Sequence, residues 1–567
     1  MFKWFPWRFI IRQVARRNRF LDPFKIMARV KNLAQPSEIA APLELVRAGF
    51  AFHARGFVNS QAVQHNLDWI WPYWIERQYD PTDPAFIPRA FNITHTNLTH
   101  RNWTALGLPD SSELPLVDPR GLVTPFFDGW SLDTWFIPRS GRSLLPSRQE
   151  SADQQLGFDP YSVLTRCSDT HSKLTSRVLV EKDSKDHYCM LDVEVQSELE
   201  GNLVISLRPY NPEGISFIDS AELAHDRKSL RINGTDLIEL SEAPGRVLMD
   251  TYEEGDVFAA LQYVNGMTDQ KRNDSSMKCS AGMGTVAAAW PLDKNGQRLV
   301  RLKIPLRDDS KEQSSATLSL KHSRPDSWKP VVARTSKLSI PDSRMQFLYD
   351  AAIRTLILHS STDVYPGPYT YKRFWFRDAA FILNALISIG LAERIKPIIE
   401  QFPQKQTALG YFLSQEGEWD ANGEALWIIH RYVETTGERV SDKLMKSIVK
   451  GGKWISSKRL SKVKDSPHAG LFPAGFSAEH FGPNDYYYWD DFWGVAGLKV
   501  SADLLQSNAS ETQIKRFQDD AESFMSAIND SLDHTRKRLK TEAIPASPYR
   551  RMDVGAVGSL VASYPLQ

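Results

Sequence analysis

The spacing of hydrophobic residues divides this chain of 567 residues into parts with different patterns. Between residues 121 and 337, short runs alternate between apolar and polar side chains, most clearly at 189–195 and 300–306. The turn-forming pair Asn295-Gly296 precedes the second of these runs. Alternation with a period of two is typical of strands that bury one face, and turn residues between such runs favour antiparallel pairing. The pattern predicts an antiparallel β-sandwich over residues 121–337.

From Pro341 onward the hydrophobic spacing becomes that of helices. Residues 374–389 are apolar on almost every face, which predicts a buried helix. Residues 421–436 form a second apolar helix, and a glycine follows each of the two segments, as is common after a helix. Further helices are predicted over residues 442–455, 491–506 and 511–532. No strand pattern of comparable strength occurs in this part of the sequence, so residues 338–567 are predicted to form an all-α domain.

The chain as a whole is predicted to be multidomain, because 567 residues are far too many for one hydrophobic core. An N-terminal region of mixed structure, residues 1–120, precedes the β-sandwich and the helical domain. Within it, residues 43–55 and 62–71 are candidate helices, and Pro72 is expected to stop the second. Residues 1–20 are basic and aromatic, which is typical either of a helix in weak contact with a membrane surface or of a helix packed on the domain behind it.

Composition and charge exclude several classes of function. The net charge of +1 at pH 7 provides no basic field for nucleic acid. No apolar stretch is as long as the roughly 18 residues that a transmembrane helix needs. The three cysteines, Cys167, Cys189 and Cys279, are too few and too scattered for a disulfide framework or a metal cluster. They indicate a reducing compartment, so we expect a cytoplasmic protein.

Acidic and aromatic side chains crowd the predicted starts of three helices. The first group is Trp375, Arg377 and Asp378, the second is Glu418, Trp419 and Asp420, and the third is Glu479, His480, Trp489, Asp490 and Asp491. A guanidinium donates and a carboxylate accepts hydrogen bonds, the combination that sugar hydroxyls require. Two structural explanations remain open: an Arg377–Asp378 ion pair that only fixes helix packing, and an Asp420 that serves only as an N-cap. The sequence has no phosphate loop, zinc spacing or nucleophile elbow, so no metal and no cofactor are predicted.

The order of the three groups carries a resemblance to a known family. Trp-x-Arg-Asp at 375–378, Trp-Asp-Ala-x-Gly at 419–423 and Trp-Asp-Asp at 489–491 resemble the six-hairpin glycoside hydrolases, which include glucoamylase-type, debranching-type and trehalase-like enzymes. The resemblance covers about residues 180–567 and implies a β-sandwich followed by an all-α (α/α)6-type toroid. About seven or eight helices are predicted after residue 341. A complete toroid contains more, so this one is expected to be incomplete at its C-terminal end.

The resemblance also implies roles for single residues. Arg377 and Asp378 match the pair that holds the terminal glucose in this family. Asp490 matches the acid that protonates the leaving oxygen, and Asp491 would then bind substrate. Glucoamylases have two glutamates at these positions, which leaves open which of the two carboxylates is the acid. The other residues expected in substrate binding are Trp375, Glu418, Trp419, Asp420, Glu479, His480 and Trp489.

The expected function is hydrolysis of α-glucosidic bonds in oligo- or polysaccharides with inversion. In that mechanism one carboxylic acid protonates the glycosidic oxygen while a second carboxylate activates water on the opposite face. The sequence does not identify the second carboxylate. Two alternatives remain open: a non-catalytic carbohydrate-binding protein on the same fold, and an inverting disaccharide phosphorylase in which phosphate replaces the base. The expected partner in each case is a carbohydrate and not a nucleic acid.

Overall fold

The computed structural model divides into two compact units, which we describe separately. The sandwich unit comprises Arg47–Arg373, and the helical unit comprises Phe374–Gln567 together with Met1–Val46. The residues that the structure describes are 13, 43–84, 86, 103–109, 111–149, 152–183, 186–262, 272–306, 327–369, 371–462, 466–477, 484–506 and 510–566. The predicted membrane-surface helix within residues 1–20 lies outside this described part, residue 13 excepted.

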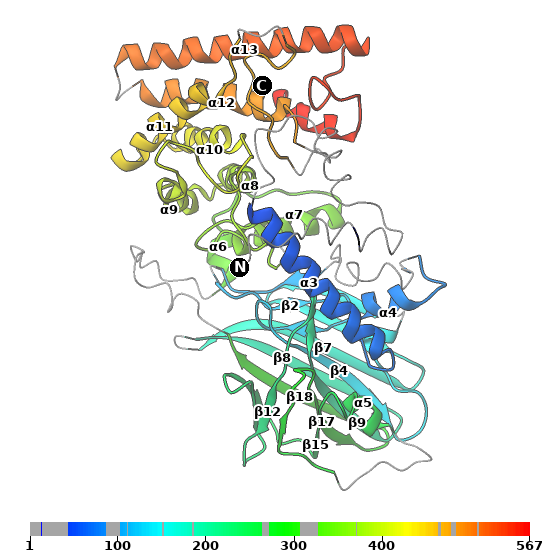
Figure 1. Ribbon diagram of the computed structural model, residues 1–567. Helices are drawn as coiled ribbons and strands as arrows, with labels where there is room; N and C mark the ends of the chain where they lie inside the picture. The colour runs from blue at the N-terminus through cyan, green and yellow to red at the C-terminus, as the bar shows by residue number, and fades with distance from the viewer. Residues whose placement is uncertain are drawn as a thin grey trace. The chain divides into compact units, whose positions relative to one another are not determined.

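Antiparallel strands fill most of the sandwich unit (Figure 1). One sheet has the strand order β1 (Thr104–Ala105), β2 (Leu116–Val117), β3 (Val123–Thr124), β4 (Ser131–Pro138), β9 (Gly201–Arg208), β17 (Thr285–Leu292) and β15 (Arg246–Asp250). The other has the order β16 (Ser276–Lys278), β12 (Ser220–Leu223), β13 (Ser229–Ile232), β14 (Asp236–Leu240), β18 (Gly296–Pro305), β8 (Asp186–Ser197), β7 (Ser172–Asp183), β6 (Tyr161–Ser168) and β5 (Asp153–Phe158). A short hairpin joins β10 (Tyr210–Asn211) to β11 (Gly214–Ile215). The predicted antiparallel sandwich is confirmed.

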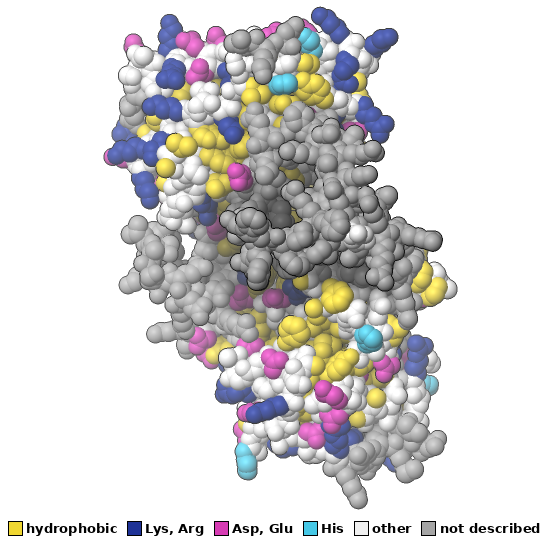
Figure 2. Space-filling view, in the orientation of Figure 1, with side chains coloured by type: hydrophobic (Ala, Val, Ile, Leu, Met, Phe, Trp, Pro, Cys, Tyr) yellow, Lys and Arg dark blue, Asp and Glu magenta, His cyan; other side chains and the backbone are white. Residues whose placement is uncertain are grey.

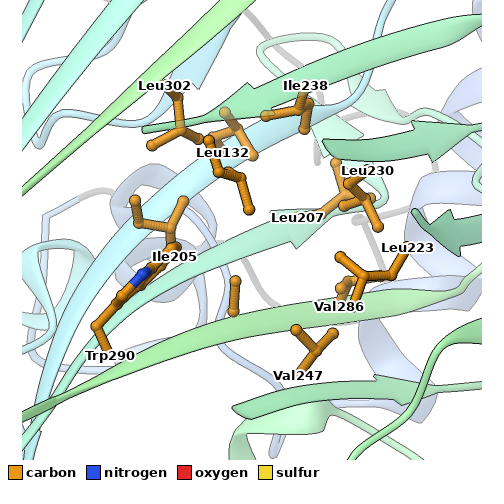
Figure 3. A pocket seen from close by; sticks show the side chains of 12 residues that line it. Leu132, Ile205, Leu207, Leu223, Leu230, Ile238, Val247, Val286, Trp290 and Leu302 are labelled. Carbon is orange, nitrogen blue, oxygen red and sulfur yellow. The ribbon is translucent and has the colours of Figure 1, made fainter. Parts of the chain in front are cut away.

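The two sheets pack face to face over an apolar core. Side chains from both sheets, among them Leu132 of β4 and Ile238 of β14, surround a cavity of about 20 Å³ (Figure 3). Such a cavity has room for about one water molecule, and its hydrocarbon walls offer no hydrogen bonds to hold one. We therefore regard it as a small packing defect of the sandwich.

The position of each strand explains its hydrophobic pattern. In β8, Cys189 and Leu191 are fully buried while Gln196 is exposed, so the alternation seen in the sequence marks a sheet with one solvent face. In β4 every residue is buried. Its second face is covered by Ile70 and by α5 (Val257–Leu261), which pack against Trp135. A strand buried on both faces has no alternation, which is why β4 is hard to recognise from sequence.

The prediction of two helices at 43–55 and 62–71 is wrong. A single helix, α3 (Leu43–His65), runs through the first range and ends within the second, and α4 (Tyr73–Tyr79) follows. The residues between them are non-helical and apolar because they join the core, where Trp71 lies against Tyr210 with ring centres 5.4 Å apart. Pro72 immediately precedes α4 and does not end a helix.

Helices dominate the chain after residue 341. The α-helices there are α7 (Ser343–Leu358), α8 (Phe376–Ser388), α9 (Ile395–Ile399), α10 (Ala421–Thr436), α11 (Asp442–Lys458), α12 (Tyr488–Leu505) and α13 (Glu511–Leu539). Short helical segments occupy Trp328–Val332 (α6), Ala392–Arg394 (η4), Phe402–Lys405 (η5) and Val554–Ala562 (η7), and Pro146–Arg148 (η2) lies in the sandwich unit. Among the described residues after 341 there is no strand, so the predicted all-α character of this part is confirmed, and the domain bounds 338–567 stay a prediction. As expected, the glycines after α8 and α10, Gly390 and Gly437, both have positive φ.

Alternate helices of the helical unit lie side by side. Arg431 of α10 reaches Asn384 of α8 at 3.5 Å. On its other side α10 approaches α12 so closely that a Cβ atom on Gly423 would lie 2.1 Å from the carbonyl oxygen of Trp493. The outer helices α11 and α13 lie on a surface that carries many Lys and Arg side chains (Figure 2). This alternation of inner and outer helices is that of an α/α toroid.

Candidate sugar-binding site

The start of α12 places two acidic side chains in the first turn of that helix. The helix begins at Tyr488, three residues before the predicted start. The backbone N–H groups of Asp490 and Asp491 donate hydrogen bonds to the carbonyl oxygen of Tyr487, at 3.1 and 3.3 Å. The positive end of a helix dipole favours negative charge at this position. Both side chains are almost fully buried, with 1% of each residue exposed.

Arg377, in the first turn of α8, connects this helix to the start of α10. Its guanidinium lies 3.4 Å from Glu418, 3.8 Å from Asp420 and 3.7 Å from Asp378. The side chains of Arg377 and Asp378 are 14% and 28% exposed, whereas those of Glu418 and Asp420 are each 4% exposed. Two buried carboxylates therefore hold the guanidinium from behind, while Arg377 and Asp378 reach solvent.

Asp420 stands at the N-cap position of α10 but does not act as a cap. Its backbone is helical, with φ −61° and ψ −32°, and its side chain makes no capping hydrogen bond. Its carboxylate instead accepts a hydrogen bond of 2.7 Å from the indole Nε1 of Trp489 on α12. The interpretation of Asp420 as an N-cap alone is therefore wrong. Asp420 links all three helix starts, because it also lies beside Arg377.

The two remaining tryptophans of the predicted site differ in their surroundings. Trp375 is half-buried, and its indole nitrogen points to the side chain of Gln415 at 3.5 Å. Trp419 is buried in the packing of the helical unit: its indole donates to the carbonyl oxygen of Pro473, and Lys458 lies 3.9 Å above its ring. Trp375 is therefore the more accessible of the two, and Trp419 has a packing role.

Asp491 and Arg377 contact different groups of residues. Its Oδ1 accepts a hydrogen bond of 2.9 Å from the backbone N–H of Phe472, and its Oδ2 is buried with no hydrogen-bond partner in the described structure. Burial raises its pKa from 3.8 to about 8, against the opposing effects of the Phe472 N–H and of the positive charge of Arg459. Asp491 thus anchors the segment before α12, while its neighbour Asp490 remains the candidate acid.

Tyr411 contacts the backbone of the acidic group, although no sequence motif pointed to it. Its hydroxyl lies 2.8 Å from the backbone carbonyl oxygens of both Gln415 and Glu418, which share its one proton as acceptors. Its pKa is raised well above the usual value of 10, first by burial and then by the charges of Asp420, Glu418 and Asp490. The Tyr411 phenol therefore stays neutral beside the acidic group.

Glu424 is a second residue that the sequence analysis missed. It follows Asp420 by one turn of α10, and it is fully buried. Its pKa is raised well above 4.5, first by burial and then by Asp420, while Arg377 acts in the opposite direction. A glutamate on an otherwise apolar helix, four residues after an acidic residue, is a signal that could have identified it.

Two predicted site residues, Glu479 and His480, lie outside the described residues. Within the described part of the chain, no group of three or more His, Cys, Asp or Glu side chains has an arrangement that could hold a metal ion. In the same part, the helices are all too short or too polar to cross a membrane. The three cysteines are buried and free.

Comparison with known proteins gives structural matches and none from sequence. No protein-family model matches the sequence, and the comparison with curated proteins also found no match. A bacterial glucoamylase complexed with acarbose matches with a TM-score of 0.56 and 12% identity, over 77% of this chain and 68% of that chain. A putative kojibiose phosphorylase from the human microbiome matches with a TM-score of 0.40 and 8% identity, over 72% of this chain and 62% of that chain.

The likeness to the glucoamylase establishes the fold. At 12% identity it carries no information on the reaction or on single residues. The architecture described above, an antiparallel sandwich followed by alternating inner and outer helices, agrees with the fold expected from the three sequence motifs. Over the part that the comparison covers, the chain shares the fold of this glucoamylase, a β-sandwich followed by an α/α toroid.

Proposed function

We propose that the chain is a glycoside hydrolase that acts on α-glucosidic bonds of oligo- or polysaccharides by an inverting acid/base mechanism. The observation that carries this proposal is the convergence of three helix starts on one site. Arg377 from α8, Asp420 before α10 and Trp489 from α12 are joined by contacts of 3.8 and 2.7 Å. Such a constellation, on a fold shared with a glucoamylase, supports recognition of a sugar.

Arg377 and Asp378 are the proposed contacts to a terminal sugar ring. They are the more exposed members of the acidic group, and together they offer charged donors and acceptors to neighbouring hydroxyls. Glu418 and Asp420 lie behind the guanidinium and restrict its orientation, so that less conformational entropy is lost when a sugar binds. Trp375 is the proposed aromatic contact.

Asp490 is the proposed general acid. It follows Trp489, whose indole donates to Asp420, and it is buried in the first turn of α12. Asp491 is the weaker candidate, because one of its two oxygens already accepts a hydrogen bond from the backbone of Phe472. A general acid contributes about 10²–10⁴ in rate when it is positioned at the leaving oxygen.

The test of the proposed function is a substrate screen with the full chain. Maltose, isomaltose, trehalose and starch are each incubated with the protein, with and without phosphate, and products are followed by proton NMR. Inverting hydrolysis of an α-glucoside predicts that β-glucose is released first. Glucose 1-phosphate in the presence of phosphate would favour the phosphorylase, and binding without turnover would favour the non-catalytic alternative. Absence of both binding and turnover with all four sugars would contradict the proposal.

The place of action stays a prediction. The free, buried state of the cysteines supports the reducing, cytoplasmic location that we propose. Weak contact of residues 1–20 with a membrane surface also stays a prediction, which vesicle sedimentation of the full chain would test.

A further inference from the structure

Glu424 is a buried carboxyl group of the helical unit that the proposed mechanism does not use. Glu424 on α10 has no exposed surface, and its two side-chain oxygens have no hydrogen-bond partner in the described structure. An isolated, ionised carboxylate is very costly in such a setting, whereas its neutral form is tolerated. The geometry therefore favours a protonated Glu424.

Glu424 follows Asp420, a member of the proposed sugar site, by one turn of α10. Its backbone N–H donates to the carbonyl oxygen of Asp420 at 3.1 Å, so its side chain lies one helical turn deeper on the same face of α10. The charges that change the pKa of Glu424 are, in decreasing order of their effect, those of Asp420, Arg377, Glu418 and Asp378. Arg377 is the member of this group that would gain from a negative charge at Glu424.

The elements packed around α10 supply further groups. From α12 come the acids Asp490 and Asp491, and Trp493, whose indole nitrogen is buried without a partner in the described structure. On the α11 side, Gly451 contributes its backbone carbonyl, which accepts from Asn422 at 3.0 Å. On the α9 side, Lys396 pairs with Glu438 beyond the far end of α10. The charges around Glu424 are therefore mostly negative. Arg377 is the cation among those that change the pKa of Glu424.

We propose that Glu424 is a positioning residue for Arg377, and that its uncharged carboxyl leaves the guanidinium in the group formed with Asp378, Glu418 and Asp420. This proposal rests on the proposed function, because it assigns sugar binding to Arg377. When Glu424 loses its proton, a further carboxylate appears below the guanidinium in a poorly solvated site. Charge attraction is strong in such surroundings, so Arg377 is drawn inward and away from the sugar. Sugar binding then requires a protonated Glu424 and weakens at alkaline pH.

The test compares wild-type protein with Glu424→Gln, which has nearly the same shape and is neutral at every pH. Glu434→Gln is the control, because Glu434 lies on the same helix in an exposed pair with Arg431. Maltose affinity of the full chain is measured by calorimetry between pH 6 and pH 10. We expect at least a tenfold loss of affinity with rising pH in the wild type and in Glu434→Gln, and no comparable loss in Glu424→Gln. Parallel loss in all three proteins would overturn the proposal.

A second measurement does not depend on sugar binding. The Nε–H resonance of Arg377, identified by its absence in Arg377→Lys, is followed by NMR over the same pH range. We expect it to shift with pH in the wild type and to stay constant in Glu424→Gln. A resonance that does not respond to pH in the wild type would refute the positioning role, even if maltose binds. Absence of maltose binding at every pH, with the resonance shifting as expected, would refute the proposed function and leave the link between Glu424 and Arg377 intact.

Discussion

The replacement Asp491→Asn tests the electrostatics of the start of α12. In the wild type the Asp491 carboxyl is fully buried and accepts a hydrogen bond from the backbone N–H of Phe472. Its pKa of about 8, against 3.8 for an ordinary aspartate, means that the folded protein binds this proton more tightly than the unfolded chain does. The contribution of Asp491 to stability therefore falls as pH rises from about 4 to about 8, and it is constant below and above that range.

The size of the effect follows from this shift in pKa. A rise of roughly four pH units at 1.36 kcal/mol per unit corresponds to a cost of about 5 kcal/mol once the carboxyl is ionised in both states. Asparagine keeps the oxygen that accepts from Phe472 and carries no charge. Its amide places an unpartnered donor where the Oδ2 of Asp491 now lies, which costs about 1–3 kcal/mol. At pH 9 the variant should be more stable than the wild type by about 2–4 kcal/mol. Near pH 4, where the ionisation cost is almost absent, it should be less stable by about 1–3 kcal/mol.

Hydrogen exchange of peptides from α12, corrected for the intrinsic pH dependence of exchange, measures the opening free energy of this helix. The control is Asp503→Asn, on the same helix, because the side chain of Asp503 is 51% exposed. The difference between Asp491→Asn and wild type should change sign between pH 4 and pH 9, while the control shows no such trend. A difference that is independent of pH would refute the reasoning.

Two further predictions concern the proposed site and its support. Arg377→Ala should weaken maltose binding by about 1.5–3 kcal/mol, the range for hydrogen bonds to charged groups. Arg431→Ala, on the exposed face of α10, is the control and should leave maltose affinity unchanged. If calorimetry gives Arg377→Ala the same maltose affinity as the wild type, Arg377 has only a packing role. In Gly423→Ala the new Cβ atom would lie 2.1 Å from the carbonyl oxygen of Trp493. Such a collision with the backbone costs more than ordinary overpacking, so the variant should destabilise the helical unit by at least about 3 kcal/mol. An unchanged thermal unfolding midpoint would contradict the close approach of α10 and α12.

The helices of the site could be predicted because their signals are local. The range 421–436 agrees with α10 at both ends, and 374–389 agrees with α8 within two residues. Long apolar segments closed by glycine leave little ambiguity. The start of α12 was placed three residues late, since Tyr488 and Trp489 are compatible with either a loop or a helix until the hydrogen bonds to Tyr487 are known.

The parts that could not be predicted depend on contacts between distant residues. Ile70 and Trp71 are apolar because they cover a sheet, a fact that no helical or strand period reveals. Asp420 has the sequence position of an N-cap, and only its bond to Trp489, 69 residues away, shows its other role. Glu424 became notable only when its burial and its distance from any partner were known. Sequence selected three helix starts that lie in contact in the structure, but not the contacts that each acid makes.

The central claim is that the starts of α8, α10 and α12 form a catalytic sugar site with Asp490 as its acid. The dependence of the rate on the leaving group tests this claim most directly. The rates of wild type, Asp490→Asn and Asp491→Asn are measured on maltose, which needs protonation of its leaving oxygen, and on α-glucosyl fluoride, which needs little. The account predicts that Asp490→Asn loses about 10²–10⁴ in rate on maltose and keeps most of its rate on the fluoride. Equal loss on both substrates, or loss on maltose confined to Asp491→Asn, would contradict it.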